Sequence, residues 1–161
     1  MPEAVGFVFA FIFGSAIGSF LNVVIHRVPR EESIVFPGSA CPGCGNSIKP
    51  YDNLPIISWI LLGGKCRNCK NPISIRYPAV EFLTGCLWIL VFWQVGFTPF
   101  LPISLAFVSA IVALMFIDAE HMILPNVITY PLFVFAMLTR GVLPLVFSVD
   151  YFGDSVHSPS W

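Results

Sequence analysis

Four cysteines are spaced as two pairs, in a pattern typical of a metal site. Cys41 and Cys44 form one Cys-x-x-Cys pair, Cys66 and Cys69 form the second, and 21 residues separate the pairs. Two such turns bring four thiolates within reach of one Zn²⁺, which takes four tetrahedral ligands in a structural site. Glycines around the first pair allow the positive φ values that a metal-binding turn needs, and in the second pair we expect Asn68 to take this role.

Acidic residues stand at the ends of apolar segments, where a charge needs water, a partner or a chemical role. Asp118 follows a long uncharged stretch and is either a solvated boundary charge or a catalytic carboxylate. Glu81 stands where an apolar segment begins, and there the helix dipole stabilises an acid. Glu120 and His121 offer a metal pair or a proton relay, but neighbouring helical residues point about 100° apart and two ligands are too few for a site.

The elements that carry these residues are membrane helices. The chain is 57% hydrophobic and 11% charged, with a mean hydropathy of +0.83. Residues 4–25 and 82–117 are uncharged stretches of 22 and 36 residues, and the longer one is broken at 96–99 by a predicted turn. Residues 122–139 form a further apolar segment with Pro131 inside it, where we expect a kink. Four membrane spans are therefore expected.

The basic residues predict the topology. Seven of the eight Lys and Arg residues fall between the first and second expected spans. By the positive-inside rule this loop is cytoplasmic, which places the amino terminus and the tail after Arg140 outside. The alternative to a metal site is a pair of disulfides, and the choice depends on the compartment. A cytoplasmic loop meets a reducing environment, so the topology favours zinc.

These observations predict an all-α, polytopic membrane protein. We expect a first transmembrane helix over 1–25, a cytoplasmic zinc-binding loop domain over 26–78, and membrane helices two to four with a short non-cytoplasmic tail over 79–161. The loop is too small to be stabilised by a hydrophobic core alone, and a zinc ion would supply the additional link that it needs. Turns and short hairpins around the metal are expected there, because prolines and glycines are frequent in it.

Several segments together resemble one family, the prepilin peptidases. They are GSFLNVVIHRVP at 18–29, CPGC at 41–44, NLPIISW at 53–59, GKCRNC at 64–69 and IRYPAVE at 75–81. The similarity extends over roughly residues 14–130. It implies an aspartic endopeptidase of the bacterial inner membrane that removes the leader from type IV prepilins or type II secretion pseudopilins. Many members also N-methylate the new terminal residue with S-adenosylmethionine.

The resemblance also implies roles for individual residues. The four cysteines correspond to the family's structural zinc ligands, and Asp118, followed seven residues later by Pro125, corresponds to its first catalytic aspartate. The second catalytic aspartate of the family lies in a Gly-x-Gly-Asp motif. Asp154 does not match this motif, because Tyr151 replaces its first glycine. We therefore expect an N-terminal portion of the enzyme that does not cleave prepilin by itself.

A second class of function stays open at this point. The chain could be a noncatalytic zinc-bearing membrane module that binds substrate or complements a partner chain supplying the second aspartate. The expected partners are prepilin or pseudopilin substrates and the lipid bilayer, with no nucleic acid. No cofactor loop of the nucleotide-binding type is visible, so the site of S-adenosylmethionine is not assigned.

Overall fold

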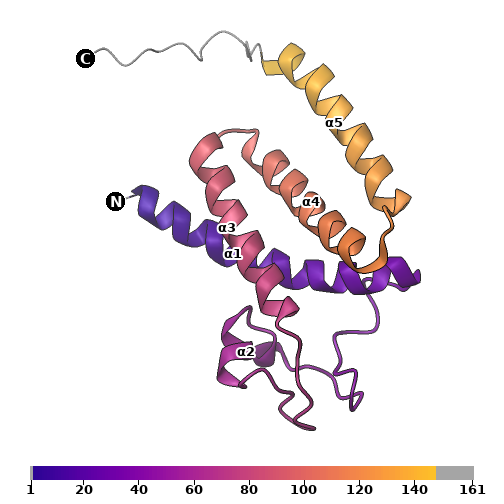
Figure 1. Ribbon diagram of the computed structural model, residues 1–161. Coiled ribbons are helices and arrows are strands. Elements are labelled where there is room, and N and C mark those ends of the chain that lie inside the picture. Colours follow the sequence, from indigo (N-terminus) through magenta and orange to yellow (C-terminus); the bar gives the residue numbers. More distant parts are fainter. Residues whose placement is uncertain (1, 148–161) are drawn as a thin grey trace. The chain divides into compact units, whose positions relative to one another are not determined.

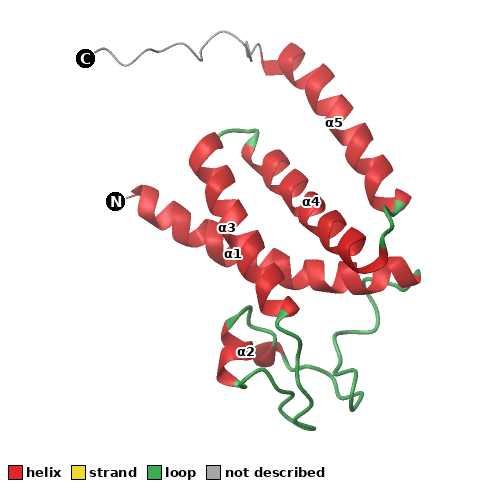
Figure 2. Cartoon of the chain, in the orientation of Figure 1, coloured by secondary structure: helices red, strands yellow, loops and turns green. Residues whose placement is uncertain are grey.

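A computed structural model describes residues 2–147, and within this range the chain is helical with no strands (Figures 1 and 2). The α-helices are α1 (Pro2–Arg27), α2 (Ile57–Leu61), α3 (Arg76–Val95), α4 (Leu101–His121) and α5 (Asn126–Phe147), with short 3-10 helices η1 (Val28–Arg30) and η2 (Pro50–Asp52). The chain divides into two compact units, one up to Pro125 and one from Asn126. The first unit contains the four paired cysteines and the acidic residues Glu81, Asp118 and Glu120.

Within residues 2–147, three helices are long and apolar enough to cross a membrane. They cover Ala4–Arg30, Arg76–Val95 and Leu101–His121. The predicted turn at 96–99 is confirmed, because α3 ends at Val95 and Gly96 follows with a φ of 62°. An all-helical, multi-pass membrane protein with its cysteine loop between the first two spans is thus confirmed.

The fourth expected span falls on α5, which forms the second unit. This helix begins at Asn126 rather than at residue 122, because Met122 ends α4 with a φ of 52° and Pro125 precedes the new helix. Its apolar portion Asn126–Thr139 is shorter than the three spans. A fourth crossing stays a prediction, and Asp154 lies outside the described residues.

Helices α1 and α3 approach closely through glycines. A Cβ atom placed on Gly85 would lie 2.6 Å from Ser15 Oγ, and one on Gly14 would lie 2.9 Å from the Cα of Gly85. One turn further along α1, a Cβ on Gly18 would lie 2.7 Å from the Cα of Glu81. Small residues spaced four apart allow backbones to touch, and in membranes van der Waals contact of this kind drives helix association.

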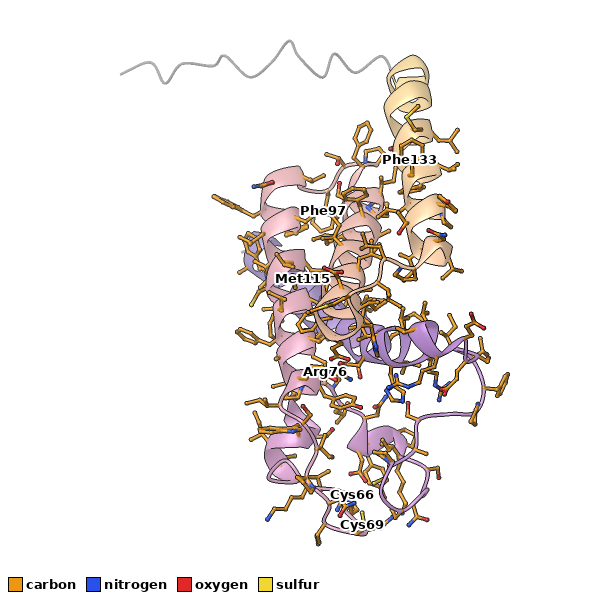
Figure 3. The ribbon with its side chains drawn as sticks, turned by 45° about the vertical axis from the view of Figure 1, so that its right-hand side comes forward. Cys66, Cys69, Arg76, Phe97, Met115 and Phe133 are labelled. Carbon is orange, nitrogen blue, oxygen red and sulfur yellow. The ribbon has the colours of Figure 1, made fainter. Side chains whose placement is uncertain are left out.

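Helix α4 completes a three-helix packing with α1 and α3. Trp88 of α3 donates its indole N–H to Ser109 Oγ of α4 over 3.0 Å. The fully buried aliphatic side chains Ile25, Val80 and Ile117 come one from each helix, near the ends where α1 and α4 stop and α3 starts. The cysteine loop extends from this end of the helices (Figure 3).

Candidate metal centre and candidate active site

The two cysteine pairs fold into equivalent turns. In the first, the N–H of Cys41 donates to Asn46 O over 2.9 Å, and the N–H of Gly45 donates to Cys41 O over 2.8 Å. The second repeats these bonds 25 positions later, from Cys66 to Asn71 O at 2.8 Å and from Lys70 to Cys66 O at 3.1 Å. One isolated antiparallel bridge closes each turn, at Ala40–Ser47 and at Lys65–Pro72. The expected short hairpins are present as these single bridges.

The residue in the left-handed conformation differs from the prediction in the second turn. Gly45 takes a φ of 69° directly after the second cysteine of its pair, and Lys70, at the equivalent position, takes a φ of 61°. Asn68 has no positive φ, so the expectation for it was wrong. The hydrogen-bond pattern determines the position, because the N–H after the second cysteine must turn back to the carbonyl of the first.

The turns face each other and bring the four thiols together. The Sγ atoms of Cys41, Cys44, Cys66 and Cys69 all lie within 4.8 Å of one another, and those of Cys41 and Cys69 are 3.7 Å apart. A tetrahedron with metal–sulfur bonds of about 2.3 Å has edges of about 3.8 Å. The donor set therefore fits one tetrahedral metal ion that prefers sulfur ligands.

The pKa values of two of these thiols, Cys66 and Cys69, are shifted in opposite directions. The backbone N–H groups of Cys69 and Asn68 lower the pKa of the Cys66 thiol to about 6. Asn71 N–H lowers the pKa of Cys69, but burial and the three neighbouring thiols outweigh it and raise that pKa to about 11. Cys66 therefore ionises more readily than Cys69, and a bound cation would favour the thiolate form of both.

Three contacts fix the loop internally. Trp59 of α2 donates its indole N–H to Ile73 O over 3.0 Å and packs on Gly64, where a Cβ would lie 2.9 Å from the ring. Arg67 forms a forked ion pair with Asp52 of η2 at 2.6 to 3.1 Å, and this guanidinium holds the pKa of Asp52 below its ordinary value. These contacts tie the second turn to the segment between the two pairs.

Glu81 joins the loop to the membrane helices. It is only 8% exposed, lies in the second turn of α3, and its Oε2 accepts a hydrogen bond from the N–H of Ile56 over 2.7 Å. The side chain of Ser19 in α1 hydrogen bonds to the same carboxylate. The expectation of an acid stabilised only by the helix dipole missed this role, because the helix begins at Arg76 and places Glu81 inside the packing.

Asp118 lies in the last turn of α4, on the side away from the other two helices. Its neighbour Ile117 is fully buried, whereas Asp118 is exposed. At about 100° per residue, the buried positions Ser109, Val112 and Ala113 share one side of the helix and Asp118 lies opposite to them. The carboxylate is therefore available to whatever packs on that side of α4.

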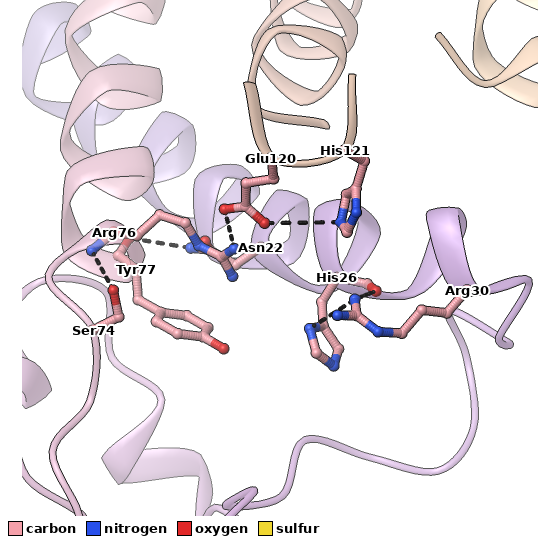
Figure 4. Close-up of polar contacts among 8 residues, drawn as sticks. All are labelled: Asn22, His26, Arg30, Ser74, Arg76, Tyr77, Glu120 and His121. Atoms are coloured by element: carbon pink, nitrogen blue, oxygen red, sulfur yellow. Dashed lines mark hydrogen bonds and ion pairs between the residues drawn. The ribbon is translucent and has the colours of Figure 1, made fainter. Parts of the chain in front are cut away.

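An ion pair next to Asp118 links α4 to α3. Glu120 Oε1 pairs with the guanidinium of Arg76, the first residue of α3, and His121 Nε2 lies 4.0 Å from Glu120 Oε2 (Figure 4). Asn22 of α1 donates to Tyr77 O over 3.1 Å beside them. Arg76 and Asn22 were not predicted as site residues, and in the sequence only their place in the resembling segments marks them.

The structure thus brings the four cysteines together, whereas Asp118 lies in a different part of the molecule. The thiols lie at the far tip of the loop, where Figure 3 labels Cys66 and Cys69, while Asp118 belongs to the membrane helices. The metal centre and the acidic helix end are separate sites. These features define a class of protein, namely a multi-pass helical membrane protein with a four-thiol candidate metal site between its first two spans.

The comparisons give the family. A family model described as Bacterial Peptidase A24 N-terminal domain matches residues 12–95. The chain is also similar to proteins named prepilin leader peptidase/N-methyltransferase, and it belongs to this family of prepilin peptidases. No solved structure matches it.

Three relatives show the extent of the similarity. The protein from Myxococcus xanthus is 46% identical over 149 residues, covering 92% of this chain and 43% of the relative. The one from Pseudomonas aeruginosa is 38% identical over 144 residues, covering 75% and 50%. The one from Dichelobacter nodosus is 38% identical over 176 aligned positions, covering 92% and 60%. The chain spans about half the length of the curated relatives it matches.

Proposed function

We propose that the chain is the zinc-bearing, membrane-embedded part of a prepilin leader peptidase. In this proposal the enzyme removes the leader from type IV prepilins or type II secretion pseudopilins. The names of the relatives support it. The observation that carries it is the exposed carboxylate of Asp118 in the last turn of α4, at the end of the helices where the basic loop begins.

The proposed chemistry is that of an aspartic protease. Two carboxylates share one proton, so that one acts as base on the attacking water while the other polarises the scissile carbonyl. Asp118 supplies one carboxylate in this proposal. The second comes from a Gly-x-Gly-Asp segment of the longer protein or from a partner chain, packed on the side of α4 that carries Asp118.

Zinc is the proposed metal at the four-thiol centre, in a structural role. A closed set of four cysteines leaves no open coordination position for substrate or water, which is typical of structural zinc. The separation of the thiols from Asp118 supports this role. Cys41, Cys44, Cys66 and Cys69 would hold the ion, and the ion would supply the folding energy that a small loop lacks.

The proposed orientation places the loop in the cytoplasm and the amino terminus outside, in the bacterial inner membrane. Basic residues at the helix ends support it, with Arg27, Arg30 and Arg76 on the loop side. The division into 1–25, 26–78 and 79–161 remains a proposal. A prepilin with its basic leader in the cytoplasm would then present the cleavage site at the level of Asp118.

N-methylation is a further part of the proposal, supported by the second half of the relatives' name. The donor would be S-adenosylmethionine, at a site that no residue here is assigned to. Equilibrium binding of radiolabelled S-adenosylmethionine to the purified chain in a bilayer tests whether this part of the protein holds the donor. Saturable binding at about one site per chain is expected. Absence of binding would show that this part of the protein does not hold the methyl donor by itself.

The peptidase proposal is tested by Asp118→Asn in the longer protein. The amide is the same size but cannot take up a proton, so leader removal should fall by at least about 10²- to 10⁴-fold. The readout is cleavage of a purified prepilin in a bilayer. Glu120→Gln, two residues further along α4, is the matched control and should keep activity within about tenfold. Retained turnover in Asp118→Asn would contradict the assignment.

A further inference from the structure

The loop exposes ten large apolar side chains, and six of them belong to two short segments, 35–36 and 54–61. Each of the six has between 51% and 79% of its surface exposed, and we call them the apolar collar: Val35, Phe36, Leu54, Ile57, Ile60 and Leu61. Large apolar side chains that are exposed together mark an interaction site on a protein surface.

The first part of the apolar collar is tied to the end of a membrane span. Arg27, the last residue of α1, donates from Nη1 to Ser33 O over 2.8 Å and from Nη2 to Pro37 O over 2.7 Å. These two carbonyls stand on either side of Val35 and Phe36. The tip that carries both side chains is therefore fixed beside the end of α1.

The second part is tied to a different span. The bond from Ile56 N–H to Glu81 places the start of α2 alongside the second turn of α3. Ile56 holds a φ of 62°, which is unusual for a β-branched residue and persists only where the surroundings impose it. The buried carboxylate of Glu81 thus fixes the depth of α2 relative to the membrane helices.

Helix α2 has two unlike sides. Ser58 is buried and donates to Leu54 O over 2.7 Å, and Trp59 packs inward on the second cysteine turn. Ile57, Ile60 and Leu61 are exposed, and at about 100° per residue they share the side of α2 opposite Trp59. The polar turns that carry the cysteines lie further from the membrane helices than α2 does (Figure 3).

One end of the apolar collar adjoins the exposed surface of a membrane span. A cavity of about 330 Å³ between α1 and the loop has Phe20 and Val23 on its α1 side and Val35 on its loop side. Phe20 and Phe82, on α1 and α3, are 47% and 55% exposed in segments that cross the bilayer. The exposed side of α1 and the Val35 end of the apolar collar therefore line one cavity, together with polar groups such as Ser19 and Arg27.

We propose that the apolar collar is immersed in the interfacial layer of the bilayer leaflet on the loop side, with phospholipid as its partner. The loop then stands half in the membrane, with the cysteine turns in water and α2 lying at the level of the headgroups. Its two ties, at Arg27 and Glu81, hold it at that depth. This inference needs only the membrane spans and is independent of the peptidase activity.

Photocrosslinking tests the partner directly. Leu61→p-benzoylphenylalanine and Phe36→p-benzoylphenylalanine are placed separately in the chain, in vesicles of phosphatidylethanolamine and phosphatidylglycerol, and adducts are identified by mass spectrometry. Both should give phospholipid adducts. Lys70→p-benzoylphenylalanine, on the exposed second cysteine turn, is the matched control and should give several-fold fewer. Equal lipid labelling at all three positions, or adducts to a second copy of the chain instead of lipid, would overturn the proposal.

The two ties can be separated with the same readout. Glu81→Leu removes the acceptor for Ile56 N–H, so lipid adducts at Leu61 should fall while those at Phe36 persist and report a folded chain. Glu81→Gln keeps an acceptor oxygen and should restore the adducts at Leu61. Unchanged adducts at Leu61 in Glu81→Leu would show that the carboxylate does not set the depth of α2. Running the same variants in the longer protein detects whether its later segments replace lipid on this surface, which would also overturn the inference.

Discussion

The cysteine loop and the three-helix unit are held together in opposite ways. The loop depends on a few defined groups, namely four thiols within 4.8 Å and two turns with the same hydrogen bonds. The helices depend on the absence of side chains, because Gly14, Gly18 and Gly85 let backbones touch. Replacing a single sulfur ligand should abolish the metal site and with it the fold of the loop. The helix contacts, in contrast, can only be weakened by adding a side chain between the backbones. The predictions below follow this difference.

The largest effect is expected from removing one thiol. Cys66→Ser leaves three sulfur ligands, and structural zinc sites in small domains supply apparent free energies of about 10 to 16 kcal/mol. The variant should lose its bound metal and its loop should become sensitive to protease, while the helical circular dichroism of the spans persists. Metal content is measured by elemental analysis of the purified protein.

Cys86→Ser is the matched control for this prediction. Cys86 lies in α3, outside the four-thiol cluster, and its replacement should leave one metal ion per chain. Equal metal content in Cys66→Ser and in the parent protein would contradict the assignment of the cluster. Equal loss in both variants would show that metal binding depends on the helices as well.

A smaller effect is expected from filling a helix contact. In Gly85→Leu the new side chain would meet Ser15 Oγ and the ring of Phe11 below 3 Å. Overpacking of this kind costs about 1 to 3 kcal/mol, so the free energy of unfolding in mixed micelles should fall by that amount while metal content stays unchanged. Leu90→Ala, at a half-exposed position of the same helix, should change stability less. The reverse order would show that the glycine contact does not hold the helices.

The smallest effect is expected at the ion pair that closes the helix ends. A double-mutant cycle of Arg76→Gln and Glu120→Gln should give a coupling energy of about 0.2 to 1 kcal/mol, because both side chains remain partly exposed. High salt should reduce it. A coupling energy of zero at low salt would mean that α3 and α4 are joined by packing alone.

The sequence predicted the parts of this molecule that depend on composition or spacing. The spans follow from uncharged stretches, the turn at 96–99 from Gly96 and Pro99, and the metal cluster from the two cysteine pairs. These signals are local, so each can be detected without knowing what packs against it. The expectation for Asn68 failed because the turn is defined by its hydrogen bonds and not by residue preference.

Features that depend on tertiary contact were missed. Glu81 looks like an ordinary acid near a helix start until Ile56, 25 residues earlier, is found at its carboxylate. The partner of Arg76 lies 44 residues away, at Glu120. The role of Asp118 rests on the resemblance, since the described structure shows where the carboxylate lies but not the group that would face it.

The equivalence of the two cysteine turns has a consequence for the order in which the metal centre assembles. Gly45 takes its left-handed conformation freely, whereas Lys70 at the matching position gives up about 1 to 2 kcal/mol to do so. A chain that has lost its ion therefore relaxes first at the second turn, and the first turn keeps its shape. The first turn would then be the better preformed half of the site when the ion binds.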